Sequence, residues 1–372
     1  MANNKVHDII IIGAGIIGLL TAREWVQQGA NVLILEKGLV GSEASWAGGG
    51  IVSPLYPWRY SPQVTALSHW AQKAYPELAR QLAEETGIDP EFNPSGLLMV
   101  RVDDEQQALE WSKSEDRNIQ WQDRDSLYSL EENLAPGFEG ALWMPDVGNI
   151  RNPRLLKALH HYLKKSGQVN IIEHSEVFNF ICNHSRVQAV QTNSGEYSAD
   201  QYVVSAGAWT GKLLKTCDIY LPIQPVRGQM MVFQSQPGVL KHIVLCDGRY
   251  VIPRRDGRIL VGSTLEHVEF DKSITDSARA LLQKAAAAMI PALGELPVEK
   301  HWAGLRPGSP GGVPVISCAE EFENLFINAG HYRNGLVLAP ASVRLLMDLM
   351  LERTPFINPE PYQCAANISQ LT

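Results

Sequence analysis

The order of hydrophobic and polar residues along the first part of the chain predicts a strand, a helix and a second strand. Residues 8–12 end in four consecutive isoleucines, without the polar alternation of a half-exposed strand, and therefore predict a strand buried on both faces. Apolar residues recur at helical spacing over 16–28, and 31–35 is a second apolar run. This order is typical of the βαβ unit of a parallel sheet.

The same pattern predicts a mixed α/β protein over the rest of the chain. Asn152 and Pro153 indicate a helix start with Asn152 as its cap, and Asp256 with Gly257 indicates a hairpin turn. The expected helices are 61–86, 106–114, 126–133, 152–165, 277–289 and 336–351, and the expected strands are 96–102, 169–173, 177–181, 187–192, 201–204, 226–233, 239–246, 250–253, 258–263 and 325–328.

The turn between the first strand and helix reads Gly-Ala-Gly-Ile-Ile-Gly over residues 13–18. In the dinucleotide-binding fingerprint Gly13 makes the tight turn, Gly15 lets the backbone approach a pyrophosphate, and Gly18 lets the helix pack on the strand. Glu36 closes the second strand, where a carboxylate can accept from the ribose hydroxyls. The acid favours NAD or FAD over NADP but does not separate the first two. The alternative is a glycine-rich turn that binds nothing.

Residues 38–51 are mostly small and show neither helical nor strand periodicity. Because small residues let backbone approach a flat ligand closely, we interpret this segment as backbone wrapped around the rest of the cofactor. A plain surface loop is the alternative.

Composition narrows the class of protein. The chain has 372 residues, 45% of them apolar, which is enough for two folded domains. Its net charge of −8 gives no basic footprint for nucleic acid. Its five cysteines form no CxxC pair, so neither a disulfide framework nor a metal site is expected. Unpaired thiols of this kind favour a protein of the reducing cytoplasm. The absence of a long uninterrupted apolar run predicts no membrane span.

Four further motifs accompany the glycine turn: 203–209 (VVSAGAW), 250–254 (YVIPR), 302–308 (WAGLRPG) and 330–340 (GHYRNGLVLAP). With all five in this order, the chain resembles the D-amino acid oxidase family of FAD-dependent oxidases, and most closely its glycine oxidase branch, which serves bacterial thiamine synthesis. The likeness covers nearly the whole chain, and the last two motifs are the most diagnostic.

The resemblance implies two interwoven domains. A Rossmann-like FAD-binding domain would be discontinuous and comprise residues 1–89, 146–220 and 305–372. A smaller substrate-binding domain, built on an antiparallel sheet, would comprise 90–145 and 221–304. A homo-oligomer is also expected.

The resemblance also implies roles for individual residues. Tyr250, Arg306 and Arg333 would bind and orient the substrate carboxylate. Val177 would meet the adenine end of FAD through its backbone, and 331–337 would lie against the flavin. The implied cofactor-binding residues are Gly13, Gly15, Ile16, Ile17, Gly18, Glu36, Lys37, Ala44, Ser45, Gly49, Gly50, Ile51, Val177, His331, Tyr332, Arg333, Asn334, Gly335, Leu336 and Val337.

The sequence around each of these residues favours or disfavours the role that the resemblance implies. We predict that Arg306 and Arg333 each lie in a glycine-flanked turn after an apolar segment, an unusual place for a solvated arginine, which favours a site role over a structural salt bridge. Core packing is the alternative for Tyr250. Arg254 and Arg255, at the hairpin turn, are predicted to be solvated. The histidines at 69, 160, 161, 242 and 331 are interpreted as structural or surface residues.

Three departures from the family pattern concern the pocket. Relatives often carry methionine where this chain has Ile51 and Leu265, and histidine where it has Gly248. The order of preferred substrates therefore stays open. Related sarcosine oxidases attach their flavin covalently to a cysteine near the position of Leu305 and Arg306. This chain has no cysteine there, so FAD is expected to be held without a covalent bond.

The implied reaction is oxidation of glycine and of small amines such as sarcosine, with D-alanine and D-proline slower. A hydride passes from the α carbon to the flavin, oxygen is reduced to hydrogen peroxide, and the imine is hydrolysed to the 2-oxo acid or supplied to thiazole synthesis enzymes. No protein base is required. Two alternatives remain: a dehydrogenase of the same fold that uses a quinone or carrier, and a non-catalytic NAD-binding regulatory protein.

Overall fold

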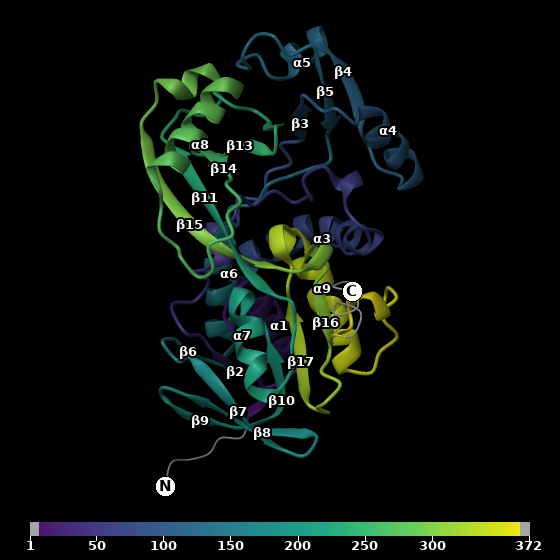
Figure 1. Ribbon diagram of the computed structural model, residues 1–372, viewed down its shortest axis with the longest axis vertical. Coiled ribbons are helices and arrows are strands. Elements are labelled where there is room, and N and C mark those ends of the chain that lie inside the picture. Colours follow the sequence, from purple (N-terminus) through teal and green to yellow (C-terminus); the bar gives the residue numbers. More distant parts are fainter. Residues whose placement is uncertain (1–6, 365–372) are drawn as a thin grey trace.

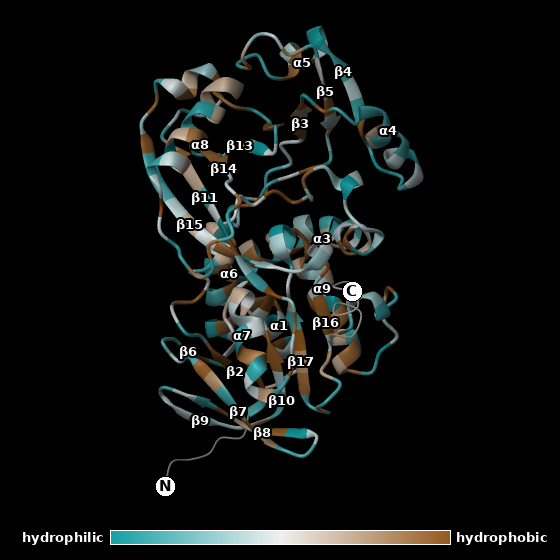
Figure 2. Cartoon of the chain, in the orientation of Figure 1, coloured by the Kyte–Doolittle hydropathy of each residue, from teal (hydrophilic) through white to brown (hydrophobic). Residues whose placement is uncertain are grey.

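A computed structural model of the chain describes residues 7–364. One half is built on a six-stranded sheet in the order β16-β17-β10-β1-β2-β6, parallel except for β16. Its strands are β1 His7–Ile12, β2 Val32–Leu35, β6 Val169–Ile172, β10 Ala199–Val204, β16 Val315–Cys318 and β17 Leu325–Ala329. Figure 1 shows this sheet in the lower half of the molecule, and Figure 2 shows its strands as largely hydrophobic.

Both faces of this sheet are covered, which explains the isoleucine run. Ile9 and Ile11 pack with four helices on one face, whereas Ile10 and Ile12 pack against β7, β8 and α7 on the other. The covering elements are α1 Ile16–Gln27, α3 Pro62–Thr86, α6 Asn152–Ser166, α9 Gly335–Met350, α7 Thr210–Leu214, and the three-stranded sheet of β7 Val177–Asn183, β8 Arg186–Thr192 and β9 Gly195–Tyr197.

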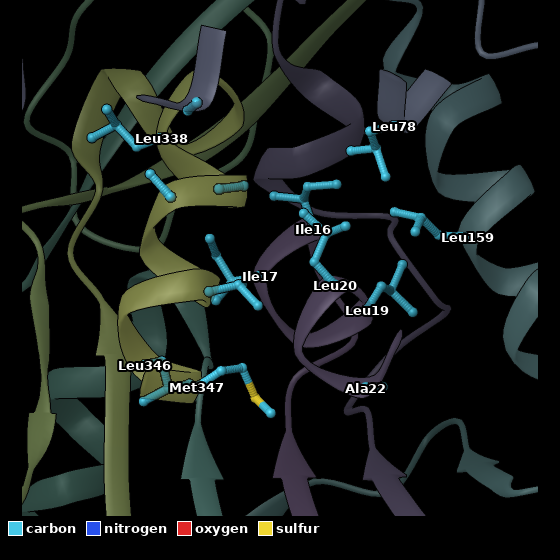
Figure 3. Close-up of a cluster of buried hydrophobic side chains, with 14 of the residues drawn as sticks. Ile16, Ile17, Leu19, Leu20, Ala22, Leu78, Leu159, Leu338, Leu346 and Met347 are labelled. Carbon is cyan, nitrogen blue, oxygen red and sulfur yellow. The ribbon is translucent and has the colours of Figure 1, made fainter. Parts of the chain in front are cut away.

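Helix α1 lies at the centre of the helical layer. Ile17 lies on the side of α1 that faces Leu346 and Met347 of α9, and Leu19 lies next to Leu159 of α6 (Figure 3). This packing holds the start of α1, and with it the glycine turn, at the carboxyl ends of the parallel strands, where ligands bind in open α/β sheets.

The other half is an eight-stranded sheet in the order β15-β11-β14-β13-β12-β3-β5-β4. Its strands are β3 Leu97–Val100, β4 Gln120–Asp123, β5 Gly140–Met144, β11 Gln224–Phe233, β12 Ile243–Cys246, β13 Arg249–Pro253, β14 Ile259–Gly262 and β15 Val298–Gly308. Helix α8, Asp276–Met289, packs on one face, and α4 Glu105–Ser114 and α5 Arg124–Leu130 lie near the β4 end (Figure 1). The predicted mixed α/β class is confirmed.

Several local predictions were wrong. Strands β4 and β5 were not predicted, and α2, Ala44–Ala47, adds one helical turn where none was expected. Arg151, not Asn152, precedes α6, and the Asn152 side chain instead donates to the carbonyls of Ser45 and Gly48 at 2.9 and 3.1 Å. The segment containing Arg306 is part of the long strand β15 and not a turn. Among residues 7–364 no helix is long and apolar enough to cross a membrane.

Candidate functional site

A cavity of about 330 Å³ lies where the parallel sheet meets the antiparallel one. Every residue predicted to bind cofactor or substrate lines this cavity except Gly18. One end is formed by the turns after β1, β2, β10 and β17, and we call it the cofactor end. The other end, which we call the substrate end, contains Tyr250, Ser263 and Arg306 from the antiparallel sheet.

The glycine turn at the cofactor end leaves no room for side chains. Gly13 has φ +105°, and a Cβ there would lie 2.6 Å from the carbonyl oxygen of Ser205. A Cβ on Gly18 would lie 2.0 Å from the carbonyl oxygen of Gly13, so Gly18 serves the packing of α1 and does not itself face the cavity. The first residue of α1, Ile16, donates its amide to Ser45 Oγ at 2.9 Å.

Glu36 is buried beside this turn, and its side chain is hydrogen-bonded to backbone amides. Its carboxylate accepts from the amides of Ala14 at 2.7 Å and Gly38 at 2.8 Å. Burial raises its pKa, and the two amide bonds partly oppose that rise. A carboxylate has about four acceptor positions, so acceptor capacity remains for the hydroxyls of a ribose.

Lys37 and Trp209 form a cationic and aromatic wall beside Glu36. Lys37 Nζ lies 2.9 Å from the centroid of the Trp209 ring and 3.9 Å from Glu43. Two residues of the segment after β14 contact these side chains. Phe270 packs on Trp209 with ring centroids 5.6 Å apart, and Lys272 forms an ion pair with Glu43 at 2.9 Å. Burial lowers the pKa of Lys37.

Buried amides without partners also line the cavity. Both side-chain polar atoms of Asn328, at the end of β17, and Nδ2 of Asn334 have no hydrogen-bond partner within the described part of the chain. Buried polar groups are almost always hydrogen-bonded, so these atoms indicate a polar ligand. Together with the glycine turn and Glu36, they fit the dinucleotide expected from the sequence.

His331 follows β17 but is not poised for proton transfer. Its side chain is 2% exposed, and Nε2 lies 3.0 Å from Ser342 Oγ. Burial lowers the pKa of His331 to about 3, so the imidazole is neutral at neutral pH. The structural interpretation of this histidine agrees with its packing.

At the substrate end, glycines make room for Tyr250. The Tyr250 ring contacts Gly262, its partner across the β13–β14 ladder, and Gly49 of the cofactor loop; a Cβ on either glycine would lie 2.7 or 3.0 Å from Tyr250 Cε2. Among the residues that the structure describes, the hydroxyl has Met230 Sδ, at 3.8 Å, as its only hydrogen-bond partner. It is therefore available to a ligand in the cavity.

Arg306 is held against the backbone of β11. Its guanidinium lies over Gly228, where a Cβ would be 2.1 Å from Nη1. It donates to Ser263 Oγ at 2.7 Å and to the carbonyls of Arg227 and Thr264 at 3.3 and 3.2 Å. Five N–H groups are available to a guanidinium, so donors remain for a ligand. Burial lowers the pKa of Arg306, and Arg333 adds to this effect.

Arg333 differs from Arg306 in its surroundings. It lies in the short 3-10 turn Tyr332–Asn334 before α9, as its glycine-flanked position predicted, and its side chain is exposed at the cavity. Within residues 7–364 it forms neither a hydrogen bond nor an ion pair. The cavity thus has one anchored and one free guanidinium.

Two sequence predictions about this region need correction. Arg254 is not solvated: it is 7% exposed and donates to three acceptors near the cavity. Of the three positions where this chain departs from the family pattern, only Ile51 lines the cavity, whereas Gly248 and Leu265 do not, and Leu265 is 47% exposed.

Sequence reasoning missed other residues of the lining. Asn152 was interpreted only as a helix cap, and Asn328 and Ser263 only as strand ends. The signal for the group after β10 was present, since a glycine turn follows a buried strand there. The main unassigned lining residues are Glu43, Gly48, Asn152, Ser175, Glu176, Phe178, Ser205, Ala206, Gly207, Ala208, Trp209, Lys212, Ser263, Pro307, Asn328 and Ala329.

Comparison with known proteins agrees with this geometry. Residues 8–349 match the family DAO, described as FAD dependent oxidoreductase. A glycine oxidase of Pseudomonas aeruginosa is 48% identical over 97% of this chain and 99% of its own length. A bifunctional protein ThiO/ThiG of Synechocystis sp. is 33% identical over 93% of this chain and 52% of its own length. The crystal structure of glycine oxidase from Geobacillus kaustophilus superposes with a TM-score of 0.90 at 28% identity, over 96% of this chain and 98% of that one.

Proposed function

We propose a function from one premise: this chain belongs to the DAO family of FAD dependent oxidoreductases. It is an FAD-dependent amino acid oxidase of glycine oxidase type, which oxidises glycine and small amines to the imine and then the 2-oxo acid while oxygen becomes hydrogen peroxide. The 48% identity to a glycine oxidase over almost the full length of both chains supports this assignment.

One structural observation carries the proposal. A single cavity joins a dinucleotide-binding turn with a free and an anchored guanidinium and a tyrosine hydroxyl. The two arginines match a carboxylate, which every substrate of the expected class has, and the guanidinium fork matches that group in geometry as well as charge. Glycine has no side chain, so its carboxylate is the largest group that such a site can bind.

The contribution of the protein to the reaction is binding and orientation. Bound FAD would supply two-electron oxidation of the carbon next to the amine and deliver the electrons to oxygen. Glu36 and the glycine turn would hold its dinucleotide part, and Asn328 and Asn334 would offer polar atoms that lack protein partners. Arg306 would fix the carboxylate so that the α carbon faces the flavin. His331 is given no role as a base, because burial lowers its pKa to about 3 and its Nε2 is hydrogen-bonded to Ser342.

The two alternatives are not favoured. A dehydrogenase of the same fold would reduce a quinone or carrier instead of oxygen, and relatives named as oxidases argue against it. A non-catalytic NAD-binding protein is disfavoured by membership of an FAD dependent family and by the two arginines that line the cavity.

Finer assignments remain part of the proposal. The cofactor and substrate roles of individual residues rest on the family resemblance. So does the division into an FAD-binding domain (1–89, 146–220, 305–372) and a substrate-binding domain (90–145, 221–304), which agrees with the two larger sheets except that its boundary at 304/305 falls inside β15. Supply of the imine to thiazole synthesis enzymes, a homo-oligomeric state and a cytoplasmic location also rest on the resemblance. A relative that joins ThiO to ThiG in one chain is consistent with the first.

The proposal is tested by the balance of the reaction. Purified protein supplied with glycine should consume one oxygen for each glyoxylate, ammonia and peroxide formed. Sarcosine should be used as well, D-alanine and D-proline more slowly. A highest specificity constant for D-phenylalanine would contradict the substrate assignment, and turnover that requires an added quinone would identify a dehydrogenase. Acid denaturation should release the flavin, whereas flavin that stays on the denatured chain would show a covalent bond.

A further inference from the structure

Arg254 is a buried cation that the proposed chemistry does not use. It stands at the end of β13, one residue past Pro253, and is 7% exposed. It forms no ion pair with any residue between 7 and 364. Burial lowers its pKa to about 10, so it keeps its charge at neutral pH. A buried charge with only neutral acceptors is costly to keep, and this cost indicates a role that an apolar residue would not fill.

The acceptors of Arg254 belong to two chain segments that meet beside the cavity. Nη2 donates to the carbonyl of Gly49 at 2.8 Å, and Nη1 donates to the carbonyl of Ile150 at 3.0 Å and to Asn149 Oδ1 at 2.8 Å. These segments also bond each other, since Ile150 donates its amide to the Gly50 carbonyl at 2.8 Å and Ile51 bridges to Asn149. Arg254 thus fastens the antiparallel sheet to both segments at once.

The loop that Arg254 holds forms part of the cavity wall. Gly49, Gly50 and Ile51 all line the cavity. Gly50 has φ +82°, and a Cβ there would lie 2.1 Å from the Ile150 carbonyl oxygen. A Cβ on Gly49 would be 3.0 Å from the Tyr250 ring. This loop therefore has little side-chain packing of its own, and its backbone position sets the space for both the cofactor and Tyr250.

We propose that Arg254 is a positioning residue that fixes the 48–51 backbone in the conformation that admits FAD, through its bonds to Gly49, Asn149 and Ile150. It does not touch the reacting atoms. The inference rests on FAD binding, which family membership establishes, and not on the identity of the amino acid substrate.

The neighbouring arginine provides a matched control. Arg255 has the same charge and the same hairpin, but its side chain is half exposed and its guanidinium binds Asp89 Oδ2 at 2.6 Å and the Phe92 carbonyl at 2.5 Å. Exposed ion pairs of this kind contribute little to the stability of the folded protein. Arg254→Met removes all three hydrogen bonds and keeps most of the side-chain volume. Arg254→Lys keeps the positive charge as a compact ammonium that cannot span the three acceptors as a guanidinium does. Arg255→Met is the control, because it removes the exposed guanidinium of the neighbouring residue.

The experiment measures FAD binding to apoprotein by equilibrium dialysis, together with the melting temperatures of apoprotein and FAD-bound protein. We expect Arg254→Met to weaken FAD binding about tenfold or more, to narrow the gap between the two melting temperatures, and to be partly rescued in Arg254→Lys, whereas Arg255→Met should bind FAD as the natural chain does. If Arg254→Met does not fold, Arg254→Lys is expected to show a smaller loss of FAD affinity.

Unchanged FAD binding in the Arg254 variants would contradict the inference. If Arg254→Met, or Arg254→Lys where the former does not fold, binds FAD as tightly as Arg255→Met while both melting temperatures fall equally, Arg254 is only structural and the inference is wrong. Failure of the natural chain to oxidise glycine would overturn the proposed function but would leave these FAD measurements unaffected.

Discussion

The two ends of the cavity are built on different principles. At the cofactor end, the glycine turn presents backbone: Gly13, Gly15 and the amides at the start of α1, held by the Glu36 carboxylate, with the side chains of Lys37 and Trp209 beside it. At the substrate end, the wall is side chains: Tyr250 and Arg306, each lying against a glycine of a neighbouring strand, Gly262 or Gly228.

This difference has a physical consequence. A backbone wall tolerates change in side-chain chemistry but not the addition of a Cβ, because its glycines approach carbonyl oxygens too closely. A side-chain wall depends on the chemical identity of each group, because a guanidinium and a carboxylate are matched in charge and geometry. Substitutions at the two ends should therefore separate FAD binding from substrate binding.

The largest expected effect is at the substrate end. Arg306→Ala removes a partner of a desolvated ion pair, a loss of about 2–5 kcal/mol, so kcat/KM for glycine should fall by about 30-fold to several thousandfold. Much of the loss should be in KM. Arg306→Lys should recover part of it, since ammonium offers no fork. Steady-state kinetics and FAD content test this: near-normal KM, or loss of flavin, would contradict the separation of the two ends.

The matching change at the cofactor end is Gly18→Ala. A Cβ there would lie 2.0 Å from the Gly13 carbonyl oxygen, and overpacking of this kind costs about 3 kcal/mol. If that strain falls on the turn, FAD affinity drops about a hundredfold, and the purified protein is pale. Gly294→Ala is the control, because its Cβ would meet only Ala287 Cβ at an ordinary 3.5 Å. Full flavin content in Gly18→Ala would contradict the model of a backbone wall.

The two ends also differ in how much of them could be predicted from the sequence. Part of the cofactor end lies within one βαβ unit, so spacing alone predicted that Gly13, Gly15 and Glu36 lie at one site. The substrate end depends on which residues lie opposite each other in the sheet: Arg306 pairs with Val226 in β15 and β11, and no local pattern showed that the 301–308 segment was a strand. Arg254 was misjudged for the same reason, since its acceptors lie about 100 and 200 positions away.

A smaller effect concerns pH and the packing behind the cofactor end. The pKa of His331 is about 3 in the folded protein against 6.5 for an ordinary histidine, so its contribution to stability is complete above pH 6.5 and is lost as pH falls toward 3. Between pH 7.5 and 5.0 this loss is about 2 kcal/mol. His331→Gln should lose that much less free energy of unfolding over the same interval, as measured by denaturant titration.

Exposed His184 is the control for this titration. His184→Gln should follow the natural chain at both pH values. Equal losses in the natural chain and in His331→Gln would show that His331 does not stay neutral in the folded protein.

The smallest effect is expected for Arg333→Ala. Arg333 is exposed and free of protein partners in the described chain, so solvent screens its charge more than that of Arg306. We expect about a tenfold fall in kcat/KM for glycine, with unchanged flavin content. If Arg333→Ala lost more activity than Arg306→Ala, the free guanidinium would be the main carboxylate anchor and the anchored one a support.

One measurement tests most directly that this cavity joins FAD to glycine. The visible spectrum of the purified protein is recorded without oxygen while glycine is added. We expect a yellow protein whose flavin absorbance bleaches with one glycine per flavin and returns, with one peroxide, when oxygen is admitted. A colourless protein that stays colourless with added FAD, or a flavin that glycine and sarcosine leave oxidised, would contradict the proposed function.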